Sequence, residues 1–266
     1  MKRVLVTGAS SGIGLATAHA LLERGYEVWG TSRDPARLPK LERFHPVRLD
    51  LRVSGEIDEV FATACRQAET FDVVVNNAGS GHFGPAELLS QAEIADQFKV
   101  LFFAHVRVMQ LALAHMRTRD AGLIVNVTSL AARLPVPFMA AYNAAKAAMA
   151  AFTMTIQLEI GSSGVRIVDL QPADICTSFN DAVPKVDQDV RYAAEIARTW
   201  ETVDRNMKTA PKPDLVAREI LRLIDRKNPP PRLTAGDVFQ AQVAPLIFRL
   251  LPQRLRLWGL KKYYGL

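Results

Sequence analysis

A glycine-rich segment near the start of this chain reads Val4-Leu-Val-Thr-Gly-Ala-Ser-Ser-Gly-Ile-Gly14. A short apolar run leads to Gly8, Gly12 and Gly14, and a helical pattern follows them. Glycines lack a Cβ atom, so such a turn lets backbone N–H groups approach a pyrophosphate at a helix N-terminus. Loops also collect glycines for turn geometry alone, so it is the position between strand and helix that favours phosphate binding.

Most of the chain alternates short β-branched runs with longer helical patterns. We expect buried strands over residues 2–7, 26–31, 45–50, 71–77, 122–129 and 164–171, and helices over 12–24, 56–67, 91–116 and 139–160. Such alternation predicts an α/β fold, a doubly wound parallel sheet with helices on both faces. We expect one domain over 1–236, including a substrate flap over about 174–212, and then a basic, apolar helical tail over 237–266.

Composition narrows the class of protein. The 266 residues are 49% hydrophobic and 23% charged, as in ordinary globular proteins. Cys65 and Cys176 are too few for a disulfide framework, which favours free thiols in a reducing compartment. Neither a signal-peptide pattern nor a membrane-spanning apolar run is found, so we expect a cytoplasmic protein.

The net charge of +6 is concentrated in the tail. After Asp237 there is no acidic residue, while Arg249, Arg254, Arg256, Lys261 and Lys262 contribute +5. This uneven placement argues against a nucleic-acid-binding surface. Leucines, a phenylalanine and a tryptophan alternate with these cations. We favour a helix packed on its own domain with its cations reaching outward; the alternative is peripheral contact with a membrane.

The segment Tyr142-Asn-Ala-Ala-Lys146 places a phenol and an ammonium on one helical face, one turn apart. A nearby ammonium favours phenolate, so we expect the pKa of Tyr142 to fall below its usual value of about 10. Such a tyrosine could protonate a carbonyl oxygen or deprotonate an alcohol. An isolated pair of this kind would be interpreted as solvated, but together with the glycine turn it favours catalysis.

Together these motifs resemble the short-chain dehydrogenases/reductases, and most of all the hydroxysteroid- and retinol-dehydrogenase-like branch. Thr7–Gly14 is similar to that family's cofactor turn, and Asn76-Asn-Ala-Gly79 to its second motif. Asp50-Leu51 resembles the adenine-side motif, and Pro172 to Thr177 the segment after the sixth strand. The resemblance implies a Rossmann-type fold and a nicotinamide cofactor that supplies hydride.

The resemblance also implies roles for individual residues, and no metal. Ser129, thirteen residues before Tyr142, would hydrogen-bond the substrate oxygen, with Tyr142 as acid or base and Lys146 on the nicotinamide ribose. The implied cofactor-binding residues are Gly8, Ser10, Ser11, Gly12, Ile13, Gly14, Ser32, Arg33, Asp50, Leu51, Asn77, Ala78, Gly79, Tyr142, Lys146, Pro172, Ile175 and Thr177.

The end of the second strand bears on the choice between NADP and NAD. Arg33 could pair with the 2′-phosphate of NADP and stack on adenine, so we favour NADP, with NAD as the alternative. Asp34 would suit NAD, but Asp34-Pro35 is better explained as an N-cap followed by proline at the first helical position.

Leu101 departs from the family pattern. Many members place an asparagine there, whose backbone binds a water that links the catalytic lysine to solvent. Leucine is an ordinary core choice on an apolar helix, and Ala104 replaces the usual glycine. The substitution removes a polar side chain that helps distort the helix. Our hypothesis is a slowed or rerouted proton supply.

The expected substrate end is apolar, which suits a bulky lipophilic carbonyl or alcohol such as a steroid, retinoid or long-chain ketone. We therefore predict an NADP(H)-dependent oxidoreductase; the alternative is a cofactor-binding sensor or scaffold with weak turnover. Residues 91–116 and 139–160 resemble the helices that form the family's subunit interface. The resemblance therefore implies a homodimer or homotetramer. The candidate substrate residues are Ser129, Phe83, Leu134, Phe138 and Phe179.

Overall fold

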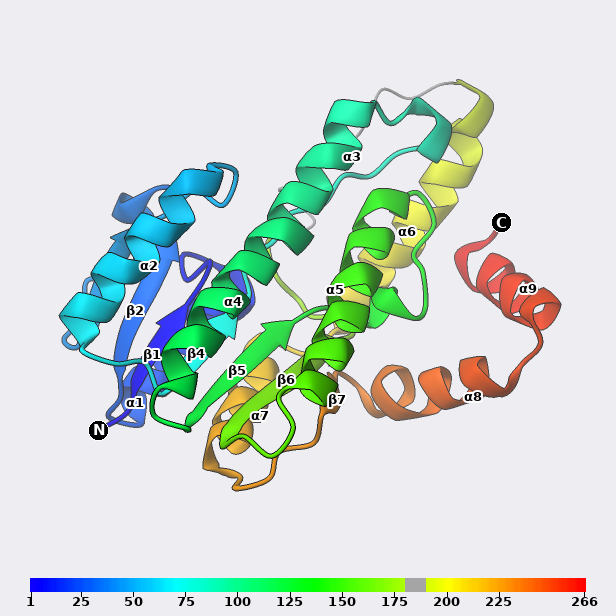
Figure 1. The fold of residues 1–266 in the computed structure, drawn as a ribbon. Helices are drawn as coiled ribbons and strands as arrows, with labels where there is room; N and C mark the ends of the chain where they lie inside the picture. The colour runs from blue at the N-terminus through cyan, green and yellow to red at the C-terminus, as the bar shows by residue number, and fades with distance from the viewer. Residues whose placement is uncertain (180–189) are drawn as a thin grey trace.

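A parallel sheet of seven strands forms the centre of this computed structural model, which describes residues 1–179 and 190–266 (Figure 1). The strand order is β3-β2-β1-β4-β5-β6-β7, and all neighbours pair in parallel, as the doubly wound prediction requires. The strands are β1 (Arg3–Val6), β2 (Glu27–Ser32), β3 (Phe44–Arg48), β4 (Val73–Asn76), β5 (Gly122–Val127), β6 (Val165–Pro172) and β7 (Arg232–Ala235).

Helices connect successive strands and cover both faces of the sheet (Figure 1). The α-helices are α1 (Gly12–Glu23), α2 (Ser54–Ala68), α3 (Gln91–Phe98), α4 (Ala104–Arg117), α5 (Ala140–Glu159), α6 (Ala193–Thr209), α7 (Asp214–Asp225), α8 (Ala244–Leu250) and α9 (Gln253–Tyr264). Short 3₁₀ segments are η1 (Pro35–Arg37), η2 (Ala86–Leu88), η4 (Leu130–Ala132) and η6 (Val190–Tyr192), and π segments are η3 (Lys99–Phe103) and η7 (Phe239–Val243).

Alternate strand residues supply two separate cores, because successive side chains point to opposite faces of a sheet. Val4 and Val6 join a cluster with residues of α1 and α7, whereas Leu5 joins one with residues of α2, α4 and α5. Both faces of the strands are therefore buried, which explains why they read as continuous apolar runs.

The expected helix over 91–116 is not continuous. A π segment, η3, separates α3 from α4, and the Ala104 N–H bonds to the Lys99 carbonyl. Leu101 lies inside this π turn and its side chain is fully buried. The helix is thus distorted here with leucine in place of asparagine, so the distortion does not depend on the polar side chain that we expected to support it.

The sheet order reverses between β1 and β4, and ligands of open α/β sheets bind at such a switch point, outside the carboxyl ends of the strands. Past β7, the tail turns through η7 into α8 and α9 beside this edge, and α9 returns to α6 (Figure 1). Tyr264, near the C-terminus, is buried.

The expected substrate flap over about 174–212 is only partly described, because residues 180–189 lie outside the described part of the chain. The part that is described contains η6 and α6. Within the described ranges, every helix is too short or too polar to span a bilayer.

Candidate active site

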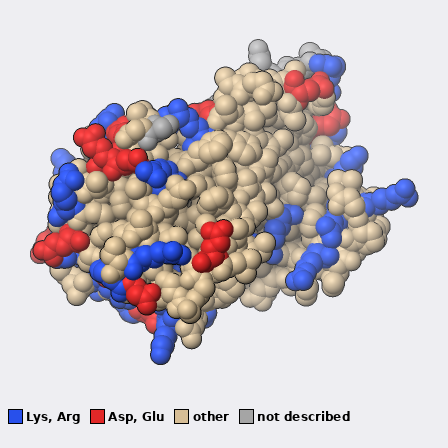
Figure 2. Space-filling view, viewed as in Figure 1, with Lys and Arg blue, Asp and Glu red and all other residues tan. Residues whose placement is uncertain are grey.

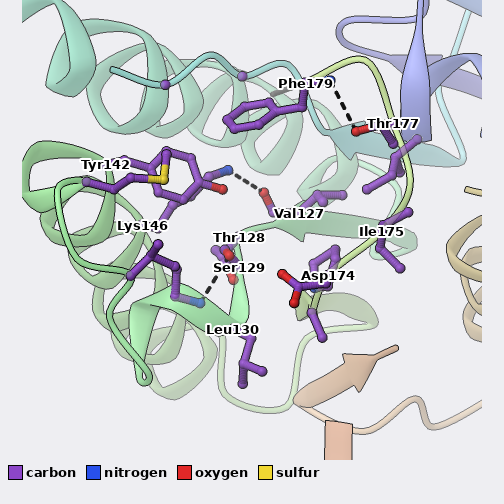
Figure 3. Close-up of a pocket in the computed structure, with 18 of the residues that line it drawn as sticks. Val127, Thr128, Ser129, Leu130, Tyr142, Lys146, Asp174, Ile175, Thr177 and Phe179 are labelled. Carbon is purple, nitrogen blue, oxygen red and sulfur yellow. Dashed lines mark hydrogen bonds between the residues drawn. The ribbon is translucent and has the colours of Figure 1, made fainter. Parts of the chain in front are cut away.

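A cavity of about 1070 Å³ extends along the carboxyl ends of the strands, from the β1–α1 turn to the tail. It is lined by every residue that we expected to bind the cofactor, with the exception of Gly14. Residues from strand ends, α5 and the segment after β6 therefore face a common space (Figure 3).

The turn between β1 and α1 requires its glycines for two different reasons. Gly8 has φ +69°, and a Cβ atom there would lie 2.8 Å from Ala78 Cα. At Gly14 a Cβ atom would lie 2.1 Å from the Gly8 carbonyl oxygen. Gly14 does not line the cavity; its missing side chain allows α1 to pack closely against the turn. Both requirements fit a backbone that approaches a phosphate closely.

Thr7 connects this turn to the Asn-Asn-Ala-Gly motif after β4. Its hydroxyl accepts hydrogen bonds from the N–H groups of Asn77 (2.8 Å) and Ala78 (3.0 Å). The Asn77 amide donates to the Thr7 carbonyl at 3.0 Å. Two sequence motifs about 70 residues apart are thereby held as one unit at the switch point.

At the expected adenine end, Ser32 and Arg33 line the cavity, and the Arg33 side chain is exposed. Asp34 accepts a hydrogen bond from the Ala36 N–H at 3.0 Å, and Pro35 occupies the first position of η1. The N-cap interpretation of Asp34-Pro35 is therefore confirmed.

Ser129, Tyr142 and Lys146 come together at the cavity (Figure 3). Ser129 lies two residues after the end of β5, as the N-cap of η4, and its Oγ accepts from the Ala131 N–H at 3.1 Å. Tyr142 lies in the first turn of α5 and hydrogen-bonds with Ser129. Lys146, one turn later, donates from Nζ to the Val127 carbonyl at 2.9 Å.

Our expectation for the pKa of Tyr142 is wrong in direction. Burial raises the pKa of this phenol, because phenolate is poorly solvated there, and the hydrogen bond with Ser129 lowers it only in part. The Lys146 ammonium lies 5.9 Å from the phenol ring centroid, and burial lowers its own pKa to about 8. Tyr142 thus keeps its proton at neutral pH, as an acid that donates to a carbonyl must.

His105, in α4, is a buried residue of the site that the sequence reasoning missed. Its Nε2 donates to the Ala78 carbonyl at 2.7 Å, and its own carbonyl accepts from the Asn76 amide at 2.8 Å. Burial and, to a lesser degree, the charge of Lys146 lower the pKa of His105 to about 3, so the imidazole is neutral. A lone histidine on an apolar helix gives no signal of this contact.

At the substrate end, Ser129, Leu134 and Phe179 line the cavity as expected. Phe83 and Phe138 do not: they pack on each other behind its wall, with ring centroids 5.8 Å apart. The tail supplies much of the wall in their place, which the sequence reasoning also missed. The tail residues that line it include Ile247, Phe248, Leu251, Leu255, Tyr263 and Tyr264.

A doubly wound sheet with a glycine turn at its switch point, beside a serine, tyrosine and lysine, defines a class of nicotinamide-dependent oxidoreductases. The sequence profile of the short chain dehydrogenases matches residues 2–188. This chain belongs to that family of oxidoreductases.

Known proteins similar to the whole chain agree. It is 28% identical to 3-ketodihydrosphingosine reductase of Bacteroides thetaiotaomicron, over 99% of this chain and 98% of that protein. A short-chain dehydrogenase from Streptomyces avermitilis superposes with a TM-score of 0.84 at 28% identity, over 98% of this chain and 96% of that one. An alcohol dehydrogenase from Thermococcus sibiricus, complexed with 5-hydroxy-NADP, gives a TM-score of 0.74 at 26% identity over 90% and 97%.

Proposed function

We propose that this chain is an NADP(H)-dependent oxidoreductase that interconverts a carbonyl and an alcohol on a bulky lipophilic substrate. One observation carries the proposal. The glycine turn, the set Ser129, Tyr142 and Lys146, and the apolar wall of the tail all open into one cavity. A cofactor and a large apolar substrate could therefore meet beside a proton donor.

The residues present fit a dinucleotide. The cavity runs past a turn that has no room for a Cβ atom at Gly8, and this is where a pyrophosphate would lie. Arg33 offers a guanidinium for a 2′-phosphate. When bound, the nicotinamide supplies or accepts the hydride.

The chain's own groups would handle the proton. Tyr142 is protonated at neutral pH and would donate from its hydroxyl to the substrate oxygen during reduction. Ser129 would hold that oxygen through a hydrogen bond. Lys146 has its pKa lowered to about 8, so its ammonium would be charged below that pH and favour the phenolate that remains.

The wall of the cavity supports the proposed substrate class. Leu251 and Leu255 of the tail face it from one side, and Leu134 and Phe179 from the domain. Apolar walls with few polar groups favour lipophilic ligands. The similarity over nearly the full length to a reductase named for 3-ketodihydrosphingosine supports a lipid-like substrate.

The cofactor preference is tested by titrating NADPH and NADH against the protein fluorescence. We expect NADPH to bind more tightly, and Arg33→Ala to weaken NADPH binding about tenfold or more while NADH changes little. Arg24→Ala, which alters an exposed arginine paired with Asp225, is the matched control. Equal loss for both cofactors in Arg33→Ala would remove the basis for an NADP preference.

We also propose that the tail, although α9 packs against α6, contacts a membrane surface through its exposed apolar residues. Leu250 is 75% exposed and Trp258 is 61% exposed, and both stand among basic residues. Figure 2 shows lysine and arginine side chains over this end of the molecule, where the sequence after Asp237 has no acidic residue. Sedimentation with vesicles of phosphatidylserine should carry the protein down at low salt and release it at high salt. If no salt-sensitive binding to the vesicles is seen, the membrane proposal is wrong and the tail serves only to line the cavity.

A homodimer or homotetramer is our proposal for the assembly. Phe103 of η3 is 61% exposed, and Leu158 of α5 is 79% exposed, on the two segments expected at the subunit interface. Light scattering should therefore report a multiple of 29.4 kDa, and Leu158→Glu should reduce it. A monomer in both cases would contradict the assignment.

A further inference from the structure

Asp174 is an acidic residue at the substrate end of the cavity, two residues after Pro172 at the end of β6. Figure 3 draws its carboxylate in the same open space as Ser129. The other acidic residues among those that line the cavity, Asp34 and Asp50, lie toward the expected adenine end. The sequence reasoning gave Asp174 no role.

Neutral donors from two other elements hold this carboxylate. Its Oδ2 accepts from the Gln240 amide at 2.6 Å and from the Asn206 amide at 3.0 Å. Gln240 also accepts from the Asp174 N–H at 3.2 Å, and Asn206 donates to the Tyr263 hydroxyl at 2.8 Å. Four side chains that line the cavity, from the β6 end, α6, η7 and α9, therefore form one polar cluster in its wall.

The cluster leaves one oxygen and one charge without a partner. Within residues 1–179 and 190–266, no donor bonds to Asp174 Oδ1, and no lysine, arginine or histidine forms an ion pair with this residue. Burial raises the pKa of Asp174, and the charge of Asp237 raises it further, while the two amides lower it. The charged form of a half-buried carboxylate is poorly solvated, and a cation bound beside it would stabilise that form.

We propose that Asp174 is a cation subsite, so that the cavity takes lipophilic carbonyl or alcohol substrates that carry a protonated amine. The amine would donate to the free Oδ1, and the apolar chain would lie against the tail. The reacting carbonyl would then be held between this contact and Ser129. The inference rests on the proposed function for the carbonyl, but the amine preference is a property of binding alone.

The test compares octylamine with octan-1-ol, a pair that differs mainly in charge, by calorimetry on the full chain with NADPH present. We expect the amine to bind at least about tenfold more tightly, as a charge-assisted hydrogen bond implies. Asp174→Asn should bring the ratio close to one. Asp237→Asn is the matched control, because it removes an exposed carboxylate from the same neighbourhood that does not line the cavity.

Three results would overturn the proposal. The first is equal binding of amine and alcohol by the natural protein, which decides the matter even if Asp174→Asn does not fold. The second is a preference for the amine over the alcohol that falls as much in Asp237→Asn as in Asp174→Asn. That result would indicate a general negative potential in this region and no specific contact with Asp174. The third is an unchanged ratio in Asp174→Asn with a selective loss of NADP⁺ over NADPH binding, which would assign the carboxylate to the nicotinamide cation. Because no turnover is measured, a failure of the proposed reaction remains distinguishable.

Discussion

Tyr142 and Lys146 share one helical face, but burial acts on them in opposite ways. It raises the pKa of the phenol and lowers the pKa of the ammonium, because a buried site disfavours the charged form of each group. The sequence predicts that the two lie together, since a spacing of four residues places them one turn apart. It could not predict the direction of the phenol pKa, which depends on the cavity around it.

Leu101→Asn tests the proton-supply hypothesis at a single residue. The leucine is fully buried, and its Cδ2 lies 3.3 Å from where a Cβ atom of Gly79 would stand. We expect the asparagine variant to turn over faster if the lost side chain limits proton supply, and to unfold more easily by about 1–3 kcal/mol because a polar group is buried. Leu101→Val controls for volume. Equal or slower turnover in the asparagine variant would refute the hypothesis.

His105 should make stability sensitive to acid. The unfolded imidazole titrates near 6.5, whereas burial holds the folded pKa at about 3, so the folded form stays neutral as pH falls between these values. The unfolded chain then binds a proton that the folded chain does not, and stability decreases with falling pH across that window. We expect His105→Gln, which does not titrate, to lose less stability from pH 7 to pH 5. Urea midpoints at both pH values measure it; parallel losses would contradict the account.

At the scale of an element, the glycine turn between β1 and α1 gives the sharpest expectation. Gly8→Ala would place a methyl group 2.8 Å from Ala78 Cα at φ +69°, where side chains are strained. We expect NADPH affinity to fall at least about tenfold, because the turn must shift away from the phosphate-binding geometry. Gly55→Ala is the control, because in α2 the added group would meet open space among the described residues beyond its chain neighbours and the helix's own backbone. Unchanged affinity in Gly8→Ala would mean that the phosphates bind elsewhere.

The π turn illustrates the limit of periodicity. The spacing of apolar residues predicts one helix over 91–116 and does not reveal the π segment within it. An α-helical turn and a π-helical turn differ by a shift of one residue in the hydrogen-bond partner, and this shift has little effect on which residue types occur. The boundaries of β1 to β6 and of α1, in contrast, follow from apolar runs bounded by polar residues, glycine or proline, and the structure places them within a few residues of the prediction.

For the whole molecule, order along the chain was enough to predict a doubly wound parallel sheet, because strand–helix alternation admits few topologies. The substrate wall depends on contacts across the chain and was harder to foresee. Phe83 and Phe138 are apolar and near the site, yet they pack behind the wall, while Leu251 and Leu255 come from the tail to form it. Asp174, Asn206 and Gln240 likewise meet only in three dimensions.

The most direct test of the account is NADPH consumption with a series of ketones of increasing chain length, measured for the natural chain and for Tyr142→Phe. We predict turnover that improves with chain length, and a loss of about 10²–10⁴-fold in the phenylalanine variant with NADPH affinity retained. Turnover that survives in Tyr142→Phe would contradict the assigned proton donor. NADPH binding without consumption on any ketone would contradict the proposed reaction and favour a cofactor-binding sensor.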